Sequence, residues 1–192
     1  MSKVFVITGP SGVGKGTLIK RLLAACPNLE LSISATTREP RPGEENGVDY
    51  HFLSPDQFEQ RIAEKDFLEF ASYSGNRYGT LRSEVEHRLE AGHSVVLEIE
   101  VQGATQVRAA KPDSVQIFIA PPDPSVLRDR LAGRGTDSAE AIDKRLETAE
   151  IELASQGDFD HRIVNDDLDR AAAELVGIVR AELGQPVDSR AE

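Results

Sequence analysis

The sequence contains a single cysteine, Cys26, so no disulfide can form within the chain. That usage suits a reducing compartment. The sequence also lacks any apolar run of the roughly 20 residues that span a bilayer. The first residues, MSKVFVIT, lead directly into a strand-like run with no small-residue cleavage site after it, so we expect neither a signal peptide nor a membrane partner. The expected location is the cytoplasm.

Basic residues are in the minority: 22 lysines and arginines face 33 aspartates and glutamates, giving a formal net charge of −11. Proteins that follow a nucleic-acid backbone normally present a basic face, so we expect no nucleic-acid partner. A small anionic substrate remains compatible if the few cations converge on one cleft. Metal-ligand spacing is also missing among the four histidines, and we find no paired nucleophile and base.

The 192 residues fit one domain, and 39% of them are hydrophobic, enough for a substantial core. Apolar strand-like runs alternate with helix-like segments, which predicts an α/β fold with a parallel sheet between helices on both faces. The expected strands are Lys3–Thr8, Leu29–Ser34, Ser94–Glu100, Ser114–Ala120 and Arg162–Val164. The expected helices are Thr17–Ala25, Glu84–Ala91, Gln102–Ala110, Pro124–Leu131 capped by Asp123, a long helix that Asp137 opens with Glu140 and that runs to about Ala154, and Leu168–Leu183. Asp166 and Asp167 are expected to cap this last helix.

The segment Thr37–Thr80 breaks this rhythm, because its strands are short and joined by turns. We expect it to form a small inserted α+β lobe. Its expected parts are a loop over Thr37–Gly47, strands over Tyr50–Leu53 and Phe67–Tyr73, a helix capped by Ser54 with Pro55 and Gln57, and a turn over Gly75–Gly79. The resulting division is a core of 1–33, 81–132 and 155–183, a lobe of about 34–80, a lid of about 133–154, and a tail of 184–192.

A glycine-rich phosphate loop follows the first strand. Residues 9–15, GPSGVGK, fit the pattern G-x-x-x-x-G-K between a predicted strand and a predicted helix. Glycines let backbone N–H groups surround a phosphate, and Lys15 can reach the β- and γ-phosphates of a nucleotide. The expected ATP contacts here are Gly9, Pro10, Ser11, Gly12, Val13, Gly14, Lys15, Gly16 and Thr17.

One position departs from the usual loop. Gly16 follows Lys15 where a Ser or Thr hydroxyl would normally bind Mg²⁺, and Thr17 comes one place later. The form GKGT resembles the loop of many nucleoside monophosphate kinases, in which the metal keeps more of its waters. We therefore predict no direct protein ligand for the metal at residue 16, and Thr17 is a candidate for contact through water.

A longer series of motifs resembles the guanylate kinase family. Two arginines three apart, Arg38 and Arg41, lie in SATTREPRPGE, a stiff loop suited to a dianionic phosphate. NGVDY, Glu69, SGNRYGT, LEIE with QG, Arg134-Gly135 and VNDD follow in the family order. The resemblance runs from about Val4 to Leu183, and it is far more specific than the phosphate loop alone.

The resemblance implies a role for each matching residue. Glu69 would accept N1–H and the N2 amine of guanine, a pairing that adenine cannot make. Ser34 and Thr80 would contact O6, and Glu98 would also contact guanine. Residues matching the GMP phosphate contacts are Arg38, Arg41, Tyr50 and Tyr78. Residues matching the lid and adenine contacts are Arg134 and Arg145, with Arg130 one turn earlier, and Asn165. Glu100 stands where the family often has Asp, and the resemblance implies that it lies near the hydrated metal as a second candidate for contact through water.

The implied function is ATP-dependent phosphorylation of GMP and dGMP with Mg²⁺, a step of purine nucleotide metabolism. The group expected to stabilise the migrating phosphoryl is Lys15, Arg38, Arg134 and Arg145, with Arg145 also reaching GMP. Two alternatives remain open: an inactive guanylate-kinase-like module that binds proteins, and a ribose bisphosphate kinase on the same framework. The sequence does not distinguish a monomer from a homo-oligomer.

Overall fold

The computed structural model describes residues 2–127 and 139–186, except for the side chains of 139–143. Its central sheet has the strand order β2-β7-β1-β8-β9, with every pair parallel. The strands are β1 (Val4–Thr8), β2 (Leu29–Leu31), β7 (Ser94–Glu98), β8 (Val115–Ala120) and β9 (His161–Val164). This arrangement confirms the predicted parallel sheet.

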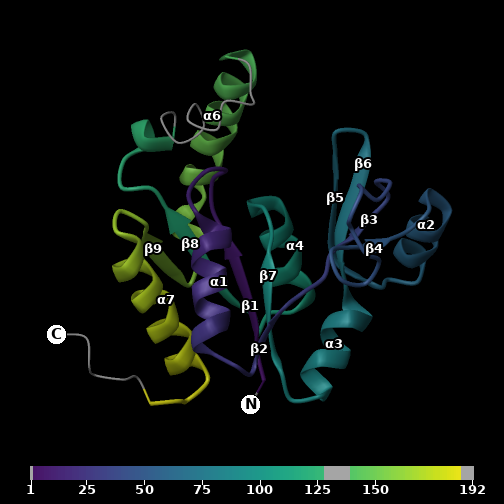
Figure 1. The fold of residues 1–192 in the computed structure, drawn as a ribbon, viewed down its shortest axis with the longest axis horizontal. Helices are drawn as coiled ribbons and strands as arrows, with labels where there is room; N and C mark the ends of the chain where they lie inside the picture. The colour runs from purple at the N-terminus through teal and green to yellow at the C-terminus, as the bar shows by residue number, and fades with distance from the viewer. Residues whose placement is uncertain (1, 128–138, 187–192) are drawn as a thin grey trace.

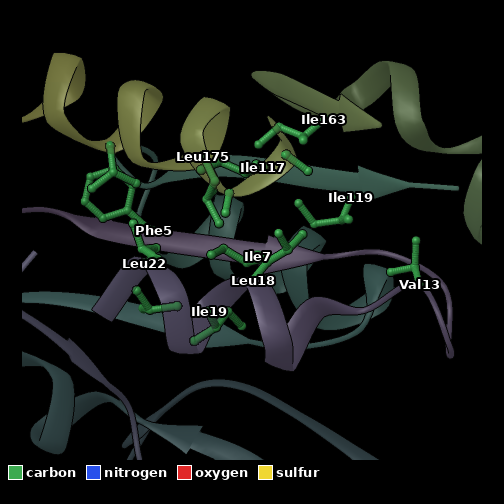
Figure 2. Packing of buried hydrophobic residues seen from close by; sticks show 14 of the residues in the cluster. Phe5, Ile7, Val13, Leu18, Ile19, Leu22, Ile117, Ile119, Ile163 and Leu175 are labelled. Carbon is green, nitrogen blue, oxygen red and sulfur yellow. The ribbon is translucent and has the colours of Figure 1, made fainter. Parts of the chain in front are cut away.

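Helices cover both faces of this sheet (Figure 1). They are α1 (Lys15–Ala25) and α7 (Leu168–Glu182) on one face, and α3 (Arg82–Glu90) and α4 (Val101–Ala110) on the other. Side chains of β1 alternate between the two layers, as the strand geometry requires. Phe5 and Ile7 pack under α1 and α7 (Figure 2), whereas Val4 and Val6 pack with the opposite cluster. The predicted three-layer fold is therefore confirmed.

The inserted segment forms a second sheet with the order β4-β3-β6-β5. Its strands are β3 (Ala35–Thr36), β4 (His51–Phe52), β5 (Phe67–Tyr73) and β6 (Asn76–Leu81). Helix α2 (Pro55–Ala63) lies against them, and its capping box of Ser54 and Gln57 is present as predicted. Phe58 and Phe67 stack with ring centroids 4.4 Å apart, so the lobe has a small core of its own.

The predicted turn over Gly75–Gly79 is wrong, because β6 begins at Asn76 and pairs antiparallel with β5. The chain reverses within two residues, Ser74 and Gly75, which both have positive φ values of 48° and 79°. That geometry matches the twist of a tight hairpin, so five residues are not needed for the reversal.

Two predicted strands are shorter than expected. Strand β2, predicted to reach Ser34, ends at Leu31, where its pairing with β7 ends. The strand predicted to reach Glu100 ends at Glu98, and Glu100 instead precedes α4 as its N-cap residue. Glu98 and Glu100 therefore do not lie on the same face of one strand, because only Glu98 belongs to β7.

The remaining elements lie in the C-terminal third. Residues 124–127 are helical, and Asp123 accepts a hydrogen bond from the Ser125 amide. The rest of the predicted helix to Leu131, together with Asp137, lies outside the described residues. Helix α6 (Ala139–Ala154) and the short 3₁₀ helix η1 (Gln156–Asp158) follow. Asp167 caps α7 by accepting from the Arg170 amide, as predicted. Within the described part of the chain, no helix combines the length and apolar content needed to cross a membrane.

Candidate active site

A cleft of about 580 Å³ opens where the central strands end. Residues from the phosphate loop, β7, the inserted lobe and α6 line it. They include Gly9, Ser11, Lys15, Ser34, Tyr50, Thr80, Glu98, Glu100 and Arg145. A second cavity of about 390 Å³ adjoins it on the lobe side and adds Glu69 and Tyr78. We call it the base-side cavity, because Glu69 and Ser34, which are predicted to contact the base, line it. Ligands of open α/β sheets bind beyond the carboxyl ends of the strands, which is where this cleft lies.

The phosphate loop is anchored in the core rather than exposed as a free turn. Val13, near its tip, is fully buried in the cluster between the sheet and α1 (Figure 2). Gly9 has a φ of 147°, and a Cβ there would lie 2.2 Å from the Ile119 carbonyl oxygen. Any side chain at Gly9 would therefore push the loop away from β8. The loop is therefore held in place against the core.

Lys15 is the first residue of α1, and its ammonium lies over the loop. Its Nζ donates to the carbonyl oxygens of Gly9 at 2.5 Å and Pro10 at 3.2 Å. Burial lowers the Lys15 pKa, while the carboxylates of Glu152, Glu98 and Glu100 oppose that shift. The lysine thus lies among three acidic side chains that favour its charged form.

Asn165 supports the loop from beneath. The residue follows β9 and is buried, and its Nδ2 donates to the Val13 carbonyl oxygen at 2.7 Å. A Cβ on Gly14, whose φ is 98°, would lie 2.6 Å from the same Nδ2. The amide expected to contact adenine is therefore part of the support of the phosphate loop.

Glu69 lies on β5 at the base of the lobe and is buried. Its Oε1 accepts a hydrogen bond of 2.8 Å from the Thr80 hydroxyl across the β5–β6 pair. Burial raises the Glu69 pKa most, Thr80 opposes the shift, and Glu100 adds to it. Ser34 lines the same cavity. The structure thus brings together Glu69, Thr80 and Ser34, and Glu98, the fourth residue predicted to contact the guanine base, lines this cavity as well.

The loop arginines lie beside the cavity walls. Arg38 pairs with Glu44 at 2.9 Å, and its guanidinium carbon is 5.4 Å from the centroid of the Tyr50 ring. The hydrogen bond that Arg38 donates to Glu44 is the main cause of the raised Arg38 pKa, and Tyr78 contributes to it. Arg41 is exposed, and its backbone N–H donates to Glu44. Neither arginine lines the two cavities, unlike Tyr50 and Tyr78.

The two acidic residues after β7 have different surroundings. Glu98 lines the main cleft, the base-side cavity and the outer side of the phosphate loop. A Cβ on Gly16 would lie 3.9 Å from Glu98 Oε1, an ordinary contact distance. Glu98 therefore borders the space that a Ser or Thr at position 16 would occupy. Glu100 lies close enough to Lys15 and Glu69 to affect the pKa of each.

Helix α6 presents one face to the cleft through Arg145, Thr148 and Glu152, at the i, i+3, i+7 spacing of a helical stripe. Ala149, between them in sequence, packs into the core cluster. Arg145 was predicted from the sequence, whereas Thr148, Glu152 and the lobe residue Tyr73, which also line the cleft, were not. The helical spacing from Arg145 was a usable signal for the first two. Arg130 and Arg134 lie outside the described residues.

Glu152 is expected to make stability depend on pH. Burial raises its pKa to about 7, with Glu100 adding to the shift and Lys15 opposing it. A carboxyl with a raised folded-state pKa destabilises the fold above that pKa, and the penalty fades as pH falls toward the unfolded value near 4.5. Glu152→Gln should therefore raise the melting temperature at pH 8.5 and leave it nearly unchanged at pH 4.5. Calorimetry at both values checks this, and an equal rise at both would contradict it.

The parallel sheet, the phosphate loop and the inserted lobe beside it define a nucleoside monophosphate kinase of the phosphate-loop class. Comparisons with known proteins identify the family. The guanylate kinase family profile matches residues 1–182. The guanylate kinases of Rubrobacter xylanophilus and Parasynechococcus marenigrum are 53% and 52% identical over 178 and 179 residues, covering 93% of this chain and 93% and 98% of theirs. This chain belongs to the guanylate kinase family.

Solved structures agree with this assignment. The crystal structure of guanylate kinase from Anaplasma phagocytophilum superposes with a TM-score of 0.73 at 32% identity, over 94% of this chain and 86% of that one. A sugar kinase from Janibacter sp. superposes with a TM-score of 0.53 at 15% identity, covering 100% of both chains. The second likeness concerns the fold alone.

Proposed function

We propose that this chain transfers the γ-phosphoryl group of ATP to GMP and dGMP, using the cleft between the phosphate loop, the lobe and α6. The family assignment carries the reaction, and the Glu69–Thr80 pair beside the cleft is the observation that supports guanine as the base. In this proposal the phosphate loop binds ATP. Arg38, Arg41, Tyr50 and Tyr78 hold the GMP phosphate, and Lys15 and Arg145 stabilise the migrating group.

Guanine suits the base-side cavity chemically. Glu69 is an acceptor with one oxygen already bonded to Thr80. Guanine presents two donors on one edge, which would satisfy a buried carboxylate whose charged form is disfavoured by burial. Adenine would instead direct its N1 lone pair at the carboxylate and leave it unpaired. A buried polar mismatch of this kind discriminates strongly between substrates.

Mg²⁺ fits the outer side of the phosphate loop when it is held through water. Magnesium prefers oxygen ligands and keeps several waters, and Glu98, Glu100 and Thr17 supply oxygen donors near the loop. Bound to the ATP phosphates, the ion would neutralise charge on the β- and γ-oxygens. Because Glu98 borders the space at Gly16, we extend the proposed contact through water to Glu98. We also propose a cytoplasmic location, since the single cysteine suits a reducing compartment.

Two observations favour phosphorylation of GMP over the two alternative functions. An inactive protein-binding module would not need an intact phosphate loop together with the loop arginines, and this chain keeps both. A ribose bisphosphate kinase would not need Glu69, Ser34 and Thr80 gathered at two adjoining cavities. The proposed function therefore accounts for residues that neither alternative uses.

A substrate panel tests this proposal. With ATP and Mg²⁺, we expect turnover of GMP and dGMP, and a kcat/KM for AMP, CMP, UMP and ribose 1,5-bisphosphate at least about 100-fold lower. A coupled assay of ADP formation measures all six. Comparable turnover of AMP would contradict guanine recognition by Glu69. Turnover of the sugar bisphosphate alone would favour the ribose bisphosphate kinase, and turnover of none would favour the binding module.

A further inference from the structure

Two glycines from different elements lie directly against Glu69. A Cβ on Gly79 of β6 would lie 2.6 Å from the Glu69 carbonyl oxygen and 2.8 Å from Phe67 Cδ1. A Cβ on Gly103 of α4 would lie 2.8 Å from Glu69 Oε2 and 3.3 Å from its Cδ. Real Cβ atoms essentially never make contacts under 3.0 Å. A side chain at Gly79 would therefore displace the β5 backbone or the Phe67 ring, and one at Gly103 would displace the Glu69 carboxylate.

Gly103 is the more informative of the two, because it meets the carboxylate itself. It is a buried residue in the first turn of α4, where glycine is a poor helix former. Its φ is not positive and so does not require glycine. A Cβ there would instead displace Glu69 Oε2, the carboxylate oxygen to which the Thr80 hydroxyl does not donate.

The same helix also holds the strand that carries Glu69. Gln106 lies three residues after Gly103, on the same face of α4. Its Oε1 accepts from the Phe70 amide at 3.2 Å, and its Nε2 donates to the Phe70 carbonyl oxygen at 3.1 Å. The Gln106 side chain thus binds both backbone groups of the residue that follows Glu69. Strand β5 is thereby fixed to the core beside the base-side cavity.

We infer that Gly103 and Gln106 of α4 are positioning residues for guanine specificity, which act by setting the orientation of the Glu69 carboxylate. Gln106 fixes the strand that bears the carboxylate. Gly103 provides the space in which the second oxygen can lie coplanar with the edge of a purine. This inference rests on the proposed function, because it assumes that Glu69 recognises the base.

Gly103→Ala tests the inference directly. Alanine favours the helix more than glycine does, so the change is not expected to prevent folding. The added methyl would displace Glu69 Oε2, and small misplacements at a binding group cost up to about 100-fold. We expect the KM for GMP to rise about 10- to 100-fold, while the KM for ATP changes less than about twofold. The preference for GMP over IMP, which lacks the 2-amino donor, should fall.

The matched control is Gly157→Ala in η1, where an added Cβ would meet nothing within 4 Å. It should behave as wild type. Gln106→Leu, which removes both bonds to Phe70, should raise the KM for GMP several-fold and provides a second variant should Gly103→Ala fold poorly. Melting curves verify folding in each case.

A double-mutant cycle separates a positioning role from a structural one. If Gly103 acts through Glu69, then Gly103→Ala should add no further rise in the KM for GMP in a Glu69→Ala background. An equal rise in both backgrounds, or an unchanged KM for GMP in Gly103→Ala, would overturn the inference. An unchanged KM for GMP in Glu69→Ala alone would instead overturn the proposed base recognition, so the two failures are distinguishable.

Discussion

Lys15→Ala should lower kcat for phosphoryl transfer by about 10²–10³-fold while leaving GMP binding intact, because the ammonium is a preorganised donor to charge that develops in the transition state. Its Nζ contacts the Gly9 and Pro10 carbonyl oxygens and faces three carboxylates. Alanine removes the one ammonium of the phosphate loop. Single-turnover assays measure the transfer step, and calorimetric titration with GMP measures binding.

Lys111→Ala is a suitable control, since Lys111 follows α4 and pairs with Asp113 at 3.4 Å, away from the cleft residues. This control should retain the wild-type kcat. Circular dichroism and melting curves should show that Lys15→Ala is folded. A folded Lys15→Ala protein with near-wild-type turnover would mean that the phosphate loop does not bind the transferred phosphates.

The core of the fold could be predicted from the sequence because its signals are local. The apolar run before GPSGVGK, the capping box at Ser54 and the capping aspartate of α7 each depend on neighbouring residues, and all three were confirmed. Strand β6 was missed because its structure depends on pairing with β5. The segment Gly75–Gly79 contains two glycines and an asparagine, residues that are typical of turns, and it forms a strand only because β5 supplies the hydrogen-bond partners.

The site was partly predictable for a similar reason. Motif order identified Glu69, Thr80, Ser34, Arg145 and Lys15 as residues that should meet, and the structure brings them to adjoining cavities. Glu152 belongs to none of the recognised sequence motifs and is distant from Lys15 in the sequence. Only the position of α6 in the fold brings the two residues close enough for each to shift the pKa of the other. The Asn165 contact with the Val13 carbonyl oxygen likewise depends on where β9 ends relative to the phosphate loop.

The charges around the cleft identify Arg145 as the second side chain whose removal should lower kcat strongly. Among the described residues that line the main cleft, only Lys15 and Arg145 are cationic, whereas Asp49, Glu98, Glu100 and Glu152 are acidic. Phosphoryl transfer needs positive charge over the migrating group. Without Arg145, a single described cation in this cleft would face the phosphates of both substrates. Of the described cations in this cleft, Lys15 alone would then remain, with the hydrated metal, to stabilise the migrating group.

Arg145→Ala is therefore expected to lower kcat by about 10³-fold, the lower end of what a catalytic arginine contributes in phosphoryl transfer. Its helix should be unaffected, since Ala149 is buried in the core and Leu146 and Leu153 pack against it. Arg145→Lys should recover only part of the loss, because an ammonium cannot bind two phosphate oxygens side by side.

The neighbouring exposed residue gives the control: Lys144→Ala removes one positive charge from α6 outside the cleft and should change kcat less than about twofold. Steady-state rates at saturating ATP and GMP distinguish these variants. If Arg145→Ala and Lys144→Ala lowered kcat by the same small factor, the effect would be that of general charge, and Arg145 would not contact the migrating phosphoryl group.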